Sequence, residues 1–239
     1  MKQKHCYSTS LKGAVLFLLL TLSLHLGAQL PVHLHLHSGL SVPVFDYASE
    51  KLDKGSYTSA GFAAGITVDA RLYASWFLMI QGGMQLHPVK VGILGYDKVQ
   101  ADPFLLDVTI RSEPYKMLHV LAGPAYNWQI AEKLRLQAGI MGGVLYAASP
   151  HQLYKPTYFM TGPDYYEITS STDYSAAFAG SLRLMYAITP CYEIGLNADA
   201  VAARAGFRFF SAAGLRTDWR NISFLNLNAA LVFRIPATQ

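Results

Sequence analysis

Residues 61–72 read GFAAGITVDARL, and large apolar side chains alternate there with small or polar ones. The even positions carry the larger apolar side chains, and the odd positions carry glycine, alanine, Thr67, Asp69 and Arg71. Successive side chains of a β-strand point to opposite faces, so this alternation predicts a strand with one apolar and one polar face.

Seven further segments repeat the pattern, at residues 32–42, 76–87, 118–130, 134–146, 174–188, 192–200 and 225–235. Each has about the 9–11 residues that a tilted transmembrane strand needs, or slightly more. The connections alternate in length. Short joins at 74–75, 131–133 and 189–191 are interleaved with long ones at about 43–59, 87–116, 147–173 and 203–220. Short turns at one end and long loops at the other are typical of an outer-membrane barrel.

All Asp, Glu, Lys and Arg residues within these segments fall on the polar face: Asp69, Arg71, Arg135, Arg183, Glu193, Asp199 and Arg234. A lysine or arginine facing lipid at mid-bilayer costs about 2–4 kcal/mol. An open sheet would also leave unpaired backbone groups in lipid, whereas closure removes its edges. The sequence therefore predicts an all-β fold, an eight-stranded antiparallel up-and-down transmembrane β-barrel. A soluble periplasmic β-sandwich or ligand-binding barrel would show the same alternation and stays open as an alternative.

Composition excludes several other classes of protein. Hydrophobic residues make up 52% of the 239 residues and charged residues 14%, against about 25% charged in an ordinary soluble domain, which argues against a disordered chain. Two cysteines are too few for a disulfide scaffold. The first 28 residues hold three of the 19 basic residues and no acid, which leaves 16 basic against 15 acidic groups. A nearly neutral remainder gives no basis for nucleic-acid binding.

The N-terminal segment 1–28 has the three parts of a secretory signal peptide. A basic start is followed by an apolar run at 14–26 and by the small residues Gly27 and Ala28. Thirteen apolar residues are too few to span a membrane but suit a signal core. We expect residues 29–239 to form the barrel domain. Cys6 would be removed with the signal, which leaves Cys191 as a lone thiol.

Two segments, LAGPAY at 121–126 and LNAALVFRI at 227–235, together with the short turns, resemble small outer-membrane β-barrel proteins of Bacteroidetes-type bacteria. These are OmpA- and OmpX-like eight-stranded barrels. The resemblance implies a monomer in the outer membrane of a Gram-negative bacterium, surrounded by outer-membrane lipid. It also implies insertion by the barrel-assembly machinery, for which Phe233 would serve as an internal recognition aromatic. It implies little about activity.

The interior of an eight-stranded barrel is only wide enough for its own side chains. We therefore expect the seven charged residues to form a paired polar network that fills the lumen, because buried charges need partners. This predicts a structural or surface-interaction protein with no cofactor and no catalytic residues. A narrow pore is the alternative use of the same residues.

Three histidines, His33, His35 and His37, share one face of the first strand, with neighbours about 6.5–7 Å apart. Two such imidazoles could converge on a zinc or copper ion, but three in a straight row could not all bind it. They are weak metal candidates, and packing in the lumen is the favoured interpretation.

Aromatic residues gather in the third long loop: Tyr154, Tyr158, Phe159, Tyr165 and Tyr166. Exposed aromatics suit recognition of an extracellular protein or glycan, because they bury area with little loss of rotamer freedom. Sequence motifs of hydrolases are absent from the chain. The neighbouring Ser149 and His151 leave open a small barrel enzyme that acts on outer-membrane lipid.

Overall fold

The computed structural model describes residues 31–53, 55–211 and 214–235, and eight of the strands close into a barrel. The expected signal peptide lies outside the described residues. The barrel strands are β1 (Val32–Pro43), β2 (Gly61–Tyr73), β3 (Trp76–His87), β5 (Tyr115–Ala131), β6 (Leu134–Ala148), β9 (Thr172–Ala187), β10 (Tyr192–Ser211) and β11 (Gly214–Ile235). Each pairs antiparallel with its neighbours in the chain, and β1 closes on β11 from Val32↔Ile235 to Pro43↔Phe224. The predicted eight-stranded up-and-down barrel is confirmed.

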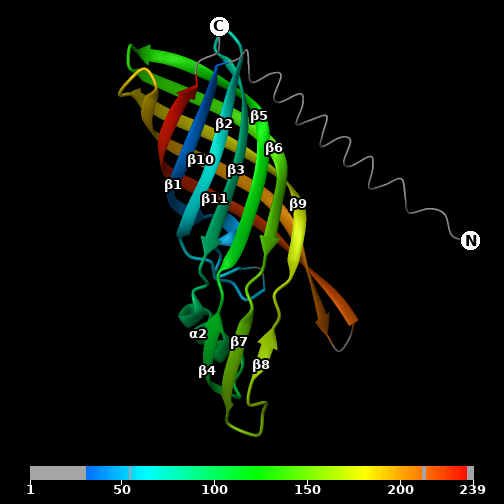
Figure 1. Cartoon of the computed structure of the whole chain (residues 1–239). Helices are drawn as coiled ribbons and strands as arrows, with labels where there is room; N and C mark the ends of the chain where they lie inside the picture. The colour runs from blue at the N-terminus through cyan, green and yellow to red at the C-terminus, as the bar shows by residue number, and fades with distance from the viewer. Residues whose placement is uncertain (1–30, 54, 212–213, 236–239) are drawn as a thin grey trace, which may run out of the picture.

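The short turns gather at one end of the barrel, at the top of Figure 1. The turn between β2 and β3 consists of Ala74 and Ser75, and Ala74 adopts the left-handed φ of 47°. Glu132 and Lys133 join β5 to β6, and residues 188–191 join β9 to β10. Aromatic side chains border this end in contact with one another, as in the pairs Trp76–Tyr126 and Tyr192–Phe233.

The opposite end carries more structure than the sequence predicted. The regions expected to be the second and third long loops contain the helix α2 (Val91–Ala101) and the strands β4 (Leu105–Ser112), β7 (Gln152–Tyr158) and β8 (Tyr166–Ile168). These strands form a separate three-stranded sheet in the order β4-β7-β8. We call α2, β4, β7 and β8 the extension, which projects beyond the barrel at the bottom of Figure 1.

The extension continues three adjacent barrel strands. β4 leads into β5, β7 follows β6, and β8 leads into β9, so the sheet keeps the neighbour order of the wall. Pro114 and Pro150 lie at two of the junctions, where a residue without an N–H interrupts the ladder. Backbone hydrogen bonds still cross the junctions, from Glu113 N to His151 O (3.0 Å) and from Ser149 N to Ser171 O (2.8 Å). The extension is therefore an ordered prolongation of the wall.

The extension has a hydrophobic core of its own. Side chains from α2, β4, β7 and the loop after β1 are buried together: Tyr57, Leu94, Leu105, Val108, Ile110 and Tyr154. Tyr57 also donates a hydrogen bond from its hydroxyl to Asp97 of α2 (2.8 Å), which ties the loop after β1 to the helix.

The fourth region expected to be a long loop, 203–220, is mostly strand. β10 and β11 remain paired from Tyr192↔Phe233 to Ser211↔Gly214 and form a long hairpin. Its distal part stands out beside the extension in Figure 1. We call residues 203–211 and 214–221 the hairpin arm.

The outer wall of the barrel is apolar, and its large side chains are unusually exposed. Ile66, Val120, Ile140, Phe178 and Leu196 are 52–70% exposed on five different strands. The predicted division of faces is confirmed, because the alternate residues of these strands point into the barrel and are mostly buried. Within the described part of the chain, no helix has the length and apolar content needed to cross a bilayer.

Candidate functional site

The middle of the lumen is occupied by a hydrogen-bonded charge network centred on Asp69 and Arg183. Asp69 Oδ1 lies 3.5 Å from Arg183 Nη1, and Asp69 Oδ2 lies 3.0 Å from His35 Nε2 and accepts a hydrogen bond from Gln137 (2.9 Å). Arg183 also donates to Thr67, Gln81 and Ser181. Several strands of the wall contribute to this network, so it fixes their relative positions from inside.

Two further carboxylates, each with its own partners, lie on either side of this centre. Toward the short turns, the carboxylate of Glu193 pairs with both Arg135 and Arg234. Toward the extension, Asp199 accepts hydrogen bonds from Ser181 (2.6 Å) and Gln81 (3.2 Å). The network therefore runs along the barrel axis.

The prediction for Arg71 was wrong, because this side chain is exposed at the β2–β3 turn and donates to the carbonyl of Ala74 (2.8 Å). Arg71 lies near the end of its strand, where a long side chain reaches water. Without it, the three lumen arginines Arg135, Arg183 and Arg234 face the three carboxylates Asp69, Glu193 and Asp199. The lumen charges are then balanced, as burial requires.

The histidine row points into the lumen, and each ring has a different neighbour. His33 packs near the ring of Phe77 (centroids 5.5 Å apart), and His35 lies against Asp69. His37 Nε2 is 3.3 Å from Thr67 Oγ1. Within residues 31–53, 55–211 and 214–235, no group of three or more His, Cys, Asp and Glu side chains is arranged to hold a metal ion.

Apolar side chains share the lumen with the polar network, and the sequence did not predict them. Inward-facing apolar side chains of β3, β5, β6, β10 and β11 form a buried cluster that includes Met79, Leu121, Leu145, Phe207 and Phe224. At mid-barrel His35, Thr67, Asp69 and Arg183 are fully buried, so no water-filled channel passes them. The lumen is a packed core, as expected for eight strands.

The loop aromatics divide into core and surface residues. Tyr154 is buried in the extension, where its ring stacks on Tyr166 (4.6 Å between centroids) and Lys98 lies over it at 5.0 Å. Burial raises the pKa of Tyr154 and lowers the pKa of Lys98. Tyr154 is therefore a core residue with no surface left for a partner, contrary to the sequence prediction.

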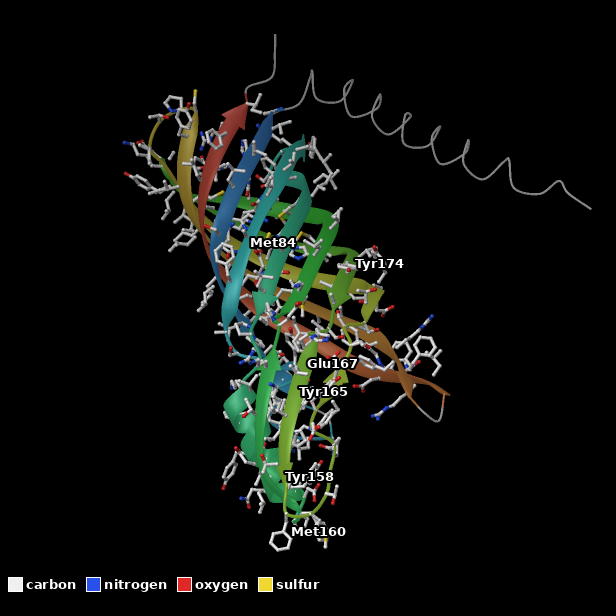
Figure 2. All side chains as sticks on the ribbon, turned by 60° about the horizontal axis from the view of Figure 1, so that its bottom comes forward. Met84, Tyr158, Met160, Tyr165, Glu167 and Tyr174 are labelled. Carbon is white, nitrogen blue, oxygen red and sulfur yellow. The ribbon has the colours of Figure 1, made fainter. Side chains whose placement is uncertain are left out.

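Other loop aromatics remain accessible. Phe159 and Tyr165 are 74% and 61% exposed, and Tyr158 is partly buried against the core of the extension. Figure 2 shows Tyr158, Tyr165 and the exposed Met160 along the extension, beyond the barrel that carries Met84. Phe104 joins Phe159 through a backbone hydrogen bond (Phe159 N to Phe104 O, 3.0 Å), so two exposed phenylalanines lie together at this tip. We call Phe104, Phe159 and Met160 the distal apolar patch.

A cleft of about 540 Å³ separates the extension from the inner face of the hairpin arm. Its walls combine aromatic rings with charged groups: Lys98, Tyr115, Glu167, Phe207, Phe209, Arg216, Asp218 and Arg220. Arg220 pairs with Asp218 (2.8 Å) and donates to the carbonyl of Gly55 (2.7 Å), which anchors the arm to the loop after β1.

Ser149 and His151 flank Pro150 beside this cleft, but their contacts differ from those of a nucleophile and its base. Ser149 Oγ accepts a hydrogen bond from Ser171 N (2.9 Å), and His151 Nε2 lies 3.4 Å from Glu167. Among the described residues no hydrogen bond joins Ser149 to His151, so the serine lacks the base that activation requires.

The missed features had weak signals in the sequence. Val108 and Ile110 alternate with Asp107, Thr109 and Arg111, which is a strand pattern. A register shift between Leu105 and Asp107, where β4 pairs with β7, interrupts this alternation. The inward apolar residues Met79, Leu121 and Leu145 have the same parity as the polar residues of their strands, and an apolar side chain at such a position interrupts the alternation that predicts the strand.

The fold and the filled lumen define a class of protein, the small eight-stranded up-and-down barrel with an apolar outer wall. No family model matches the chain, and no curated protein matches it in sequence. Among solved structures, Neisserial surface protein A (NspA) is 11% identical, with 86% of this chain and 97% of that chain covered and a TM-score of 0.48.

Ail, the attachment invasion locus protein of Yersinia pestis, is 14% identical, with 86% and 99% coverage and a TM-score of 0.41. A major outer membrane protein from Thermus thermophilus is 8% identical, with 86% and 99% coverage and a TM-score of 0.46. At these identities and scores the likeness says nothing about activity or partners, and the class rests on the barrel's own geometry.

Proposed function

We propose that this chain is an integral outer-membrane β-barrel of a Gram-negative bacterium that presents the extension outward as a surface-interaction module. The observation that carries the proposal is the outer wall. Leucine, isoleucine, valine and phenylalanine side chains on all sides of the barrel are exposed, while the buried charges lie inside in ion pairs or hydrogen bonds. A monomer in water does not normally expose an apolar surface of this extent, whereas in a bilayer the hydrocarbon of the lipids covers such a surface.

The orientation follows from the two ends of the barrel. Short turns face the periplasm and longer loops face outward in barrels of this kind. The extension is then on the cell surface, with the distal apolar patch at its tip. Exposed aromatic and methionine side chains on an ordered scaffold suit contact with an extracellular protein or glycan, and barrel insertion would use the barrel-assembly machinery.

Membrane fractionation with a heat-modifiability gel tests the membrane part of the proposal. We expect the protein in the outer-membrane fraction and a different mobility for boiled and unboiled samples, because the closed barrel survives detergent. A buffer-soluble protein whose mobility is insensitive to heating would refute it and favour a periplasmic sandwich or ligand-binding barrel.

Thiol labelling of intact cells tests the orientation. Cys191 is exposed in the β9–β10 turn, and Thr161 is exposed between β7 and β8. A bulky maleimide that does not cross the outer membrane should label Thr161→Cys in a Cys191→Ser background. It should label Cys191 of the parent only after permeabilisation. The reverse pattern would show that the extension faces the periplasm.

A further inference from the structure

The outward face of the hairpin arm changes from apolar to basic where it leaves the barrel. Along β10 the outward positions Ala198, Ala200 and Ala202 are followed by Arg204, Gly206 and Arg208. Both arginines lie at the surface, and among the described residues no carboxylate lies within ion-pair distance of either. Two guanidinium groups without a carboxylate partner in the described part of the chain therefore face the same side as the apolar wall.

Contacts with the start of β9 and with the residue before it fix the position of these arginines along the barrel axis. Gly206 N donates to Asp173 Oδ2 (2.7 Å), and Arg208 N donates to Ser171 Oγ (2.8 Å). Arg204 and Arg208 therefore lie near the start of β9, where Tyr174 packs against Tyr146 with ring centroids 5.0 Å apart. Tyrosine and tryptophan in such positions mark the boundary between hydrocarbon and headgroups.

Trp219 completes this boundary on the arm. Its register partner is Gly206, and a side chain at Gly206 would come within 3.0 Å of the Trp219 ring, so the indole lies across the outward face of β10. Arg204 stacks over the same indole at 5.1 Å. The ring holds one guanidinium in place at the level where phosphate groups of a bilayer would be.

A groove on the same outer face reaches Ala202, which lies two residues before Arg204 on β10. It has a volume of about 550 Å³ and is lined by Ala122, Gly142, Phe178, Gly180, Ala200 and Ala202. A second groove of about 390 Å³ shares Gly180 and Ala200 and continues over Ala198 and Leu227. The first groove therefore crosses β5, β6, β9 and β10, the second lies over β9, β10 and β11, and the edge at Ala202 is two residues from Arg204 on the same face of β10.

We propose that this face binds one phosphate-bearing lipid of the outer leaflet, with its phosphate on Arg204 and Arg208 and an acyl chain in the groove. The inference rests on the proposed function, since it needs the hairpin arm to be outside the cell. Arginine pairs with phosphate through two parallel hydrogen bonds, and the groove gives the chain more contact than a convex wall does. A soluble anion would use only the arginines, and an apolar partner only the groove. A lipid uses both.

The test is lipid retention by the purified barrel in detergent, measured by native mass spectrometry with diphosphorylated lipid A as the probe. The double variant Arg204→Ala/Arg208→Ala should bind at least tenfold more weakly than the parent. Arg216→Ala, on the inner face of the same arm, is the matched control and should stay within twofold. Dephosphorylated lipid A should be retained as poorly as the probe is by the double variant.

The groove has its own matched pair of variants. A side chain at Gly180 meets nothing within 4 Å, so Gly180→Leu should fold normally while it fills the groove and weakens retention several-fold. Gly82→Leu faces outward on β3, outside the lining of both grooves, and should have no effect.

Three outcomes would overturn the proposal: unchanged retention by the double arginine variant, unchanged retention by Gly180→Leu, or equally effective competition by inorganic phosphate. The mobility shift on heating is recorded for every variant to show that the barrel is folded. A parent protein without that shift would contradict the proposed function instead, so the two failures are distinguishable.

Discussion

Substitution of Asp69 by asparagine probes the charge network in the lumen most directly. The change keeps the size of the side chain and one oxygen for Gln137, but it removes the only carboxylate within 4 Å of Arg183 among the described residues. Arg183 is fully buried, so its charge would be left without a counter-ion. Breaking a buried ion pair from one side costs about 3–5 kcal/mol, and we expect about 3 kcal/mol because asparagine still accepts a hydrogen bond.

The measurement is equilibrium unfolding by guanidinium chloride in detergent micelles, followed by tryptophan fluorescence and by the fraction of heat-shifted protein. Arg71→Ala is the control from the same strand, and we expect a change within about 0.5 kcal/mol because Arg71 is exposed. The double variant Asp69→Asn/Arg183→Met should recover at least about 1 kcal/mol of the loss, since both ends of the pair are then neutral. A loss below about 1 kcal/mol for Asp69→Asn, or a double variant less stable than the single one, would refute the pairing.

Three other substitutions test the wall, the extension and a turn. Val120→Lys places a charge on the exposed wall and should lower the free energy of unfolding of the barrel by about 2–4 kcal/mol. The control Thr109→Lys, on the surface of the extension, should change it by less than about 0.5 kcal/mol. Equal effects of the two variants in the same unfolding assay would contradict a lipid-facing wall. Tyr154→Ala removes a ring from the core of the extension and should destabilise the extension by about 3–5 kcal/mol. The readout is faster proteolysis of the extension in a protein that still shows the mobility shift on heating. The control Phe159→Ala, at an exposed position, should leave the rate of proteolysis unchanged. Ala74→Gly should raise stability by about 1 kcal/mol, because glycine adopts the φ of 47° without strain; a lower unfolding midpoint would show that this turn is not strained.

Much of the barrel could be predicted because its rules are local. All eight strands lie where alternation predicted them, and the outward residues Ile66, Phe178 and Leu196 follow from parity alone. Parity could not separate Asp69, which is buried at mid-strand, from Arg71, which has the same parity but reaches water two residues later. Distance from the end of the barrel decides that difference, and an alternating pattern does not contain it.

The extension and the hairpin arm were predicted only as long connections. α2 begins with Val91, Gly92 and Ile93 and has no clear polar face, and β8 is three residues long, so neither shows a strong period. Their order depends on contacts between segments far apart in the chain, such as Tyr57 with Asp97 and Tyr154 with Tyr166.

The sequence by itself determined the number of barrel strands, the side of each that faces outward and the end of the barrel with short turns, because these depend on a two-residue period and on turn length. Only the tertiary structure decided which lumen charges pair, that apolar side chains also fill part of the lumen, and that the loops build an ordered extension. It also placed Arg204, Arg208 and Trp219 above an apolar groove. These features require side chains from several strands to meet across the barrel or along its wall, and the distances between them are set by register and closure.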